Sequence, residues 1–124
     1  MAAEIGEKVW GTTQLVMSGP GFEVHRLVIK DRTFCSMHKH ENKFNGFYVE
    51  SGSILINVGA LSKWGKEYPP AQYILNAGDE LVVEPGFFHQ FEAFSDAVVY
   101  ESYWRTDDQA LEEDIFRLTL GGKR

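Results

Sequence analysis

Short runs in which apolar and polar residues alternate recur along the chain between turn residues. Alternation with a period of two is the pattern of a strand with one buried face. Many short strands at near-regular spacing predict an all-β fold, either a sandwich or a closed barrel. The runs that we predict as strands cover residues 22–30, 31–40, 45–51, 53–58, 72–75, 80–84, 89–94 and 97–104.

Two turns carry most of the information about how these strands are connected. Gly52 separates 45–51 from 53–58, which predicts a hairpin between the two. Pro85-Gly86 precedes the run that contains His89. Glycine permits backbone conformations that branched residues avoid, so this second turn is predicted to fix the depth at which His89 enters the fold.

Two segments break the alternation. Residues 59–71 form a long connection with glycine and proline, in which Trp64 and Tyr68 suggest a lid or a partner contact. A plain surface loop is an equally consistent interpretation. Residues 107–118 have apolar residues at helical spacing, which predicts a short C-terminal helix that passes into a last strand or ends there. Those apolar positions are Ala110, Leu111, Ile115 and Leu118.

Composition narrows the class of protein. The 124 residues predict a single domain over 1–124, and an apolar content of 44% is typical of a globular chain. A net charge of −6 excludes a broad nucleic-acid surface, which needs clusters of Lys and Arg. The absence of a long apolar stretch predicts no membrane span and no secretory signal. With Cys35 as the single cysteine, no intrachain disulfide can form, and we expect a cytoplasmic protein.

Three of the four histidines indicate a metal site. His38 and His40 are two positions apart on a predicted strand, so both imidazoles point to one face, roughly 7 Å apart along it. His89, from a distant strand, would complete a triad of imidazoles on one side of a metal ion. The sequence therefore predicts one divalent metal bound by these three side chains.

The two histidine-containing segments resemble the signature motifs of the cupin superfamily. His38, His40 and Gly52 match the first motif, and Gly78, Gly86 and His89 match the second. The second motif usually has a proline at the position that Glu84 occupies in this chain. Here the proline is Pro85, one residue later. The resemblance implies a single-domain cupin β-barrel (a double-stranded β-helix, or jelly roll).

The chain also resembles, almost end to end, the C-terminal cupin domain of type II mannose-6-phosphate isomerases fused to mannose-1-phosphate guanylyltransferases. The resemblance implies a metal-dependent isomerase in carbohydrate metabolism that acts on a phosphorylated sugar. It also implies a homodimer, with 59–71 or the N-terminal segment as the expected contact. The similar segments are residues 7–11, 22–30, 49–52 and 113–117.

Two residues depart from that family. It usually has Gln at the position of His38 and Glu at the position of Asn45, which is the fourth ligand position of cupins. An amide oxygen is a neutral and weaker ligand than a carboxylate. The expected site therefore has three imidazoles, with Asn45 or water completing the shell. The identity of the metal (Zn, Fe, Ni or Mn) stays open.

Other residues are candidates for acid–base chemistry or anion binding. On the predicted strand 97–104, Glu101 shares a face with apolar residues, which indicates either a catalytic carboxylate or a structural ion pair. Arg26 or Lys30 could bind a substrate phosphate if it faces the interior. Arg117 is a third candidate for substrate binding, because of the resemblance at the end of the chain. His25 is interpreted as a tolerated structural residue.

Three functions remain open at this point. The first is a sugar-phosphate isomerase with Glu101 as its base. The second is a non-haem metal dioxygenase, since three neutral imidazoles with open coordination positions suit Fe(II). The third is a ligand-binding cupin without catalysis, which the missing carboxylate at Asn45 favours.

Overall fold

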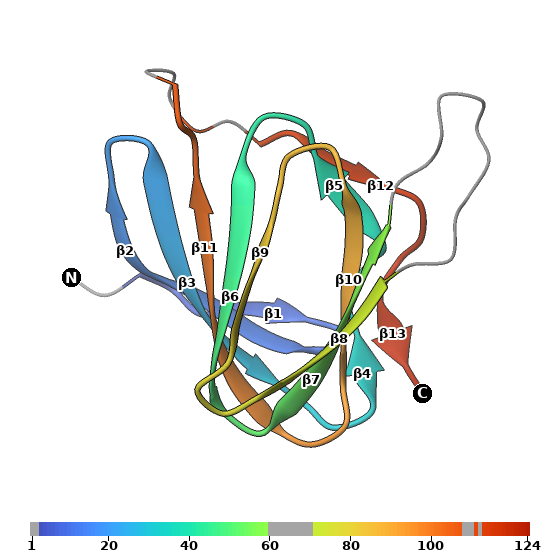
Figure 1. The fold of residues 1–124 in the computed structure, drawn as a ribbon. Helices are drawn as coiled ribbons and strands as arrows, with labels where there is room; N and C mark the ends of the chain where they lie inside the picture. Colours follow the sequence, from blue (N-terminus) through green and yellow to red (C-terminus); the bar gives the residue numbers. More distant parts are fainter. Residues whose placement is uncertain (1–2, 60–70, 108–110, 112) are drawn as a thin grey trace.

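The computed structural model describes residues 3–59, 71–107, 111 and 113–124, and within them the chain consists of strands and turns (Figure 1). The strands form two antiparallel sheets. The first has the order β1 (Gly6–Lys8), β2 (Gly11–Gly19), β3 (Phe22–Ile29), β11 (Ala97–Trp104), β6 (Phe44–Ser51) and β9 (Glu80–Val83). The second has the order β12 (Ile115–Arg117), β5 (His38–His40), β10 (Phe88–Ala93), β4 (Thr33–Phe34) and β13 (Gly122–Lys123). In that sheet β7 (Ser53–Gly59) pairs with β10 and with β8 (Ala71–Asn76).

The predicted all-β jelly roll is confirmed, but the hairpin predicted at Gly52 is wrong. β6 pairs with β11 and β9, whereas β7 pairs with β10 and β8, so the chain changes sheets at this turn. Gly52 has a φ of 80°, and a Cβ there would lie 2.2 Å from the Asp96 backbone oxygen. The turn therefore requires glycine, as expected, although the strands that it joins face each other across the core.

The core lies between the two sheets and explains why the alternation was visible in the sequence. In β3, Leu27 and Ile29 are each 1% exposed, whereas Val28 between them is 39% exposed. The same alternation buries one face of β6, β7, β10 and β11. The buried residues contributed by these strands include Phe47, Val49, Ile54, Ile56, Phe91 and Val99.

The helix predicted over 107–118 is wrong in the residues that the structure describes. Ile115–Arg117 forms β12, which pairs with β5 in the register Ile115 to His40 and Arg117 to His38. Backbone hydrogen bonds to the neighbouring strand therefore outweigh the local helical preference that the apolar spacing indicated. Residues 108–110 and 112 of this segment lie outside the described residues.

The predicted lid or contact at 59–71 lies almost wholly outside the described residues, including Trp64 and Tyr68. Within the described part of the chain, no helix has the length and apolar character needed to cross a bilayer.

Candidate metal centre

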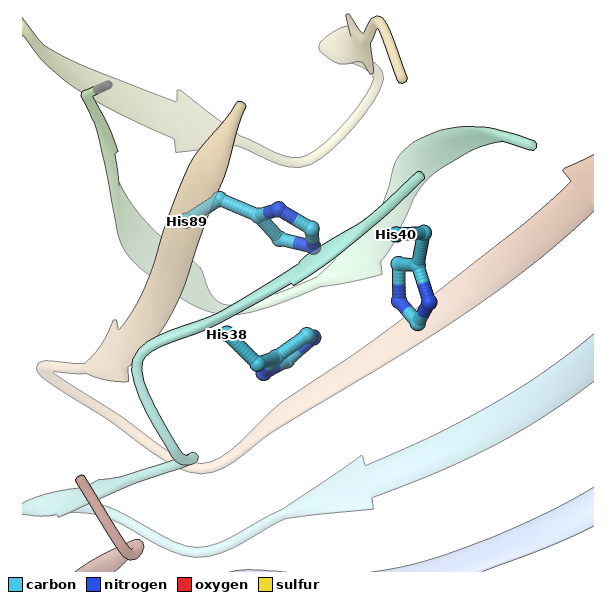
Figure 2. A group of neighbouring side chains, drawn as sticks. All are labelled: His38, His40 and His89. Carbon is cyan, nitrogen blue, oxygen red and sulfur yellow. The ribbon is translucent and has the colours of Figure 1, made fainter. Parts of the chain in front are cut away.

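The three histidines predicted as metal ligands lie together in the interior. His38 and His40 lie on the same face of β5, and His89 of β10 stands directly opposite His38 in the sheet register. Their exposed fractions are 7%, 4% and 1%. Figure 2 shows the three rings reaching into one space from the two strands, with the His38 and His89 ring centroids 4.5 Å apart.

The turn before β10 fixes the position of His89, as the sequence predicted. Gly86 has a φ of 87°, and its backbone N–H donates to the His40 backbone oxygen at 2.7 Å. The turn is thereby attached to the strand that carries the other two histidines.

Each ring is oriented by an acceptor at its Nδ1 atom. A neutral imidazole that donates from Nδ1 presents a lone pair at Nε2, which is the form that binds a metal. The three acceptors are the Ser36 backbone oxygen for His38 at 2.8 Å, the Asp114 carboxylate for His40 at 3.3 Å and the Phe87 backbone oxygen for His89 at 3.1 Å.

Burial keeps all three imidazoles neutral at physiological pH. Desolvation lowers the pKa of His38 to about 3, with further lowering from the neighbouring His89 and His40. Desolvation also lowers the pKa values of His40 and His89 to about 4. The lone pairs are thus available at neutral pH without removal of a proton.

Two features of the polar contacts fit a cation at this position. His40 Nε2 is buried and has no hydrogen-bond partner among the described residues. Both ring nitrogens of His89 face oxygen acceptors: Nδ1 lies 3.1 Å from the Phe87 backbone oxygen and Nε2 lies 2.8 Å from Asn45 Oδ1. A neutral imidazole has one N–H, so if His89 donates from Nδ1, the Nε2 and Asn45 lone pairs face each other, which a positive ion beside both would relieve.

The orientation of the Asn45 amide supports this interpretation. Its Nδ2 donates to Glu101 Oε2 and to the Ser102 backbone oxygen, both at 3.3 Å. These two acceptors require the nitrogen on their side, so the oxygen must face His89. Two adjacent ligands of one ion, each about 2.1 Å from it, lie roughly 3 Å apart, close to the separation seen here. Asn45 therefore fits the fourth ligand position.

The spacing of the three imidazoles also suits one ion. Their candidate ligating atoms all lie within 4.8 Å of one another. Nitrogens on one side of an ion, each about 2.1 Å from it, lie roughly 3 to 3.5 Å apart, so binding would draw the more distant rings together by up to about 1.5 Å.

The metal-free protein is expected to lose stability as the pH falls from about 6.5 to 4. In the unfolded chain these imidazoles bind protons near their ordinary pKa of 6.5, whereas in the folded chain they do so only near 3 to 4. Protons therefore favour unfolding, by up to about 1.4 kcal/mol per pH unit for each histidine. Urea unfolding of metal-free wild type and His38→Gln should show a shallower pH slope in the variant. Equal slopes would contradict these low pKa values.

A cavity of about 410 Å³ opens beside His38 and His40, and part of its wall carries acid–base groups. Glu101 and Tyr103 lie on one face of β11, next to Glu23 and His25 on β3. The Tyr103 hydroxyl donates to the Glu101 carboxylate, and His25 Nε2 lies 3.0 Å from Glu23 Oε2. The Tyr103 ring packs edge-on against both His25 and His40, at centroid distances of 5.8 and 5.1 Å. The wall thus extends as far as the triad.

The environment makes Glu101 a stronger base than an exposed carboxylate. Desolvation raises the pKa of Glu101, and the hydrogen bonds from Tyr103 and Asn45 oppose this only in part. Desolvation likewise raises the pKa of Tyr103 above its ordinary value, and the adjacent Glu101 charge adds to the effect.

Of the three predicted substrate-binding cations, only Arg117 lines the cavity. Its register opposite His38 places it on the side of the sheet that carries the triad. Arg26 and Lys30 alternate with the buried Leu27 and Ile29, so they lie on the outer face of their sheet. Neither can contact a ligand in this cavity.

Four residues of the site were not assigned roles from the sequence. His25 was interpreted as structural, yet it lines the cavity with Tyr103 and Lys43. Asp114 was placed in the predicted helix, yet it contacts His40 and lies 3.7 Å from Lys43 Nζ. Alternation along β11 could have identified Tyr103, because it shares a face with Glu101. No local signal identifies Lys43 or Asp114.

Cys35 is buried as predicted, and burial raises the pKa of its thiol.

The fold, though not the sequence, matches known proteins. No family model and no curated protein matches the sequence. An RmlC-like cupin from Shewanella frigidimarina has a TM-score of 0.68 at 17% identity, over 86% of each chain. The capsular polysaccharide assembling protein CapF from Staphylococcus aureus has a TM-score of 0.75 at 16% identity, over 94% of this chain and 32% of that chain.

An oxalate decarboxylase from Lactobacillus farciminis, in a formate complex, has a TM-score of 0.71 at 17% identity, over 94% of this chain and 34% of that chain. The chain thus spans about a third of the length of the CapF and oxalate decarboxylase chains that it matches. These likenesses show that the chain has the cupin fold, and its three clustered histidines form a group that could hold a metal ion.

Proposed function

We propose that this protein is a metal-dependent isomerase of a small anionic hydroxycarbonyl compound, with a phosphorylated sugar as the first substrate class to test. The observation that carries the proposal is the wall of acid–base groups in the cavity beside the histidine triad. Glu101, Tyr103 and His25 line the same cavity as His38 and His40. Isomerisation requires groups that move protons beside a carbonyl, and this wall has them.

The metal would be held by His38, His40 and His89, with Asn45 as the fourth ligand. A divalent ion bound there would polarise the carbonyl and hydroxyl oxygens of the substrate. The neutral donor set leaves the full charge of the ion available to attract an anionic substrate. Arg117 adds a second positive charge in the cavity wall and has no ion-pair partner in the described part of the chain.

Two proton transfers account for the reaction. Glu101 takes the proton from the carbon that bears the hydroxyl group and returns it to the neighbouring carbonyl carbon. His25, held by Glu23, accepts the hydroxyl proton and delivers it to the former carbonyl oxygen. The double bond moves by one position, so no oxidant or other reactant is needed. Tyr103 donates to Glu101 and holds the carboxylate in place.

Two of the similar structures are consistent with this chemistry. CapF is described as a capsular polysaccharide assembling protein, and the oxalate decarboxylase is described in a complex with formate. The same fold thus serves in carbohydrate assembly and binds a small carboxylate, which supports an anionic or sugar-derived substrate for this chain.

The proposal is tested by incubating the metal-reconstituted protein with mannose 6-phosphate or fructose 6-phosphate in D₂O. Proton NMR should show interconversion of the sugars and incorporation of solvent deuterium at the carbon next to the carbonyl. If a panel of aldose and ketose phosphates and small hydroxycarbonyl acids shows neither result, the isomerase proposal is wrong. Ligand-induced thermal stabilisation without turnover would then indicate a binding protein.

Replacing His25 by glutamine is expected to separate the two proton transfers. Glu101 can still remove and return the carbon-bound proton, so deuterium exchange into the starting sugar should persist. Interconversion should fall by about 10²-fold, the lower range for loss of an acid–base group. The same NMR assay measures both rates. An equal loss of exchange and interconversion would contradict this role of His25.

A dioxygenase is the second candidate, and the neutral donor set favours it. Three imidazoles and an amide oxygen leave an Fe(II) ion with open coordination positions. Anaerobic iron titration followed by oxygen-uptake measurements with small carbonyl, thiol and phenol compounds tests this alternative. Substrate-dependent oxygen consumption in the absence of isomerisation would replace the first proposal.

A further inference from the structure

The cavity beside the triad has two chemically different ends. One end carries the polar groups already described, and the other is lined by Trp10, Cys35 and Phe91, which are 9%, 4% and 4% exposed. We call these three residues the apolar end. Thr13 also lines the cavity and brings one hydroxyl group. Lys8 lines the cavity too, two residues before Trp10, but it is exposed to solvent rather than buried.

The strands place the apolar end one step away from the groups proposed to react. On β10, Phe91 is two residues after His89 and shares its buried face. On the facing sheet, Thr13 pairs with Leu27, which is two residues after His25 on the same face of β3. Two residues along a strand cover roughly 7 Å. A ligand bound at the triad therefore reaches the apolar end with a substituent only a few bonds long.

The aromatic side chains of this end are arranged to accept another ring. The Trp10 and Phe91 ring centroids are 5.1 Å apart with an interplanar angle of 82°, an edge-to-face pair. Aromatic rings favour edge-to-face and offset contacts, so such a pair offers both an edge and a face to a third ring.

Cys35 completes this surface without presenting an unsatisfied polar group. Its thiol donates to the Ser36 backbone oxygen at 3.4 Å, and its sulfur accepts the Phe91 backbone N–H at 3.2 Å. A buried thiol whose hydrogen bonds are made within the protein behaves as a small apolar group toward a ligand.

Leu120 adds an apolar side chain at the rim. It lines the cavity and is 78% exposed. The neighbouring Gly121 runs directly beside Cys35, since a Cβ on Gly121 would lie 3.2 Å from the Cys35 backbone. An apolar ligand group at this end would remove part of the Leu120 surface from water, which is favourable.

These surroundings discriminate between two kinds of substituent. A chain of hydroxyl groups would exchange its hydrogen bonds to water for contacts with aromatic rings and a thiol, which leaves hydroxyl groups unsatisfied. An aromatic ring has no such bonds to lose, and it releases water from apolar surface.

We propose that the ligand of this cavity is a hydroxycarbonyl acid with an aromatic substituent, whose ring packs between Trp10, Phe91 and Leu120. The position of its polar head rests on the proposed function, and the inference narrows the substrate class named there. The cavity of about 410 Å³ lies within the usual range for small-molecule sites, about 300 to 1,000 Å³.

Three 2-hydroxy acids with the same head and different tails test this preference. Lactate has a methyl tail, gluconate a polyhydroxyl tail and 3-phenyllactate an aromatic tail. Titration calorimetry with the Zn²⁺-loaded protein should show 3-phenyllactate binding at least about tenfold more tightly than either of the others, because its ring is removed from water. Equal or weaker binding of 3-phenyllactate, or no binding of it, would overturn the proposal.

Thr13→Phe places the preference within the cavity. A protein side chain then occupies the space assigned to the ligand ring, so most of the preference for 3-phenyllactate should disappear while lactate affinity stays within a few-fold. The control is Thr12→Phe, because Thr12 pairs with the exposed Val28 on the outer face and should keep the preference. Circular dichroism establishes that both variants fold. An unchanged preference in folded Thr13→Phe would contradict this position of the ring.

The outcomes separate this inference from the isomerase proposal, because binding is measured without turnover. A preference for 3-phenyllactate that depends on Thr13 supports the aromatic site even if no compound is isomerised. Isomerisation of sugar phosphates by a protein that shows no such preference would uphold the proposed function and refute the aromatic site.

Discussion

Replacing His40 by alanine is expected to lower metal affinity by more than about 100-fold and to abolish metal-dependent turnover. Loss of a residue that merely orients a ligand costs about 10- to 100-fold in affinity, and loss of the ligand itself should cost more. His40 Nε2 is buried beside the other two imidazoles and has no partner among the described residues. Metal analysis of the dialysed protein and titration calorimetry measure the effect.

Two further variants make this result specific. Asp114→Asn replaces the carboxylate that accepts the hydrogen bond from His40 Nδ1 with a neutral amide. It should lower metal affinity by about 10- to 100-fold, because the ring of His40 is then oriented less firmly. Lys39→Ala changes the residue between the two histidines, whose side chain packs over Phe88 on the other face of β5, and should leave metal binding intact. Undiminished metal content in folded His40→Ala would show that the ion binds elsewhere.

Replacing Glu101 by glutamine is expected to lower turnover by about 10²- to 10⁴-fold while leaving the metal bound. Glutamine has nearly the same shape, and its oxygen still accepts the hydrogen bond from Asn45 Nδ2. The variant therefore keeps the Asn45 orientation but lacks a group that takes a proton from carbon. Deuterium exchange and interconversion should fall together, unlike in His25→Gln.

Glu113→Gln is the matched control, because Glu113 lines the same cavity but is exposed to solvent. It should retain turnover within a few-fold, since a carboxylate exposed to water is not expected to act as the base. A Glu101→Gln variant as active as Glu113→Gln would refute the role of Glu101. Loss of metal from Glu101→Gln would instead indicate that the carboxylate acts through Asn45.

The strands were predictable where one face is buried and the other is exposed. In β3, Leu27 and Ile29 are buried and Val28 between them is exposed, as strand alternation requires. The C-terminal segment was mispredicted because helical spacing is a local signal, whereas β12 exists only through pairing with β5. The hairpin at Gly52 was mispredicted because a turn residue does not specify which sheet the next strand joins.

The candidate site was predictable in its ligands and less so in its surroundings. The spacing of His38 and His40 on one strand required a shared face, and Figure 2 shows the third imidazole reaching the same space. Arg26 and Lys30 were predicted to bind a substrate phosphate only if they faced the interior, and the sequence did not show which face of β3 is buried. The Leu27–Ile29 face packs inward, which places both cations on the outside.

By itself, the sequence predicted the all-β strands and the three imidazoles, because alternation and residue type are local properties, and the resemblance to cupins added the amide at Asn45 as a candidate ligand. Only the tertiary structure decided that Asp114 supports His40, that His25 and Tyr103 complete the cavity wall, and that Arg117 rather than Arg26 lies beside the triad. These contacts join segments far apart in the sequence, such as His40 and Asp114, which are 74 residues apart. They depend on the register between strands, and register is set by how the two sheets bury their inner faces.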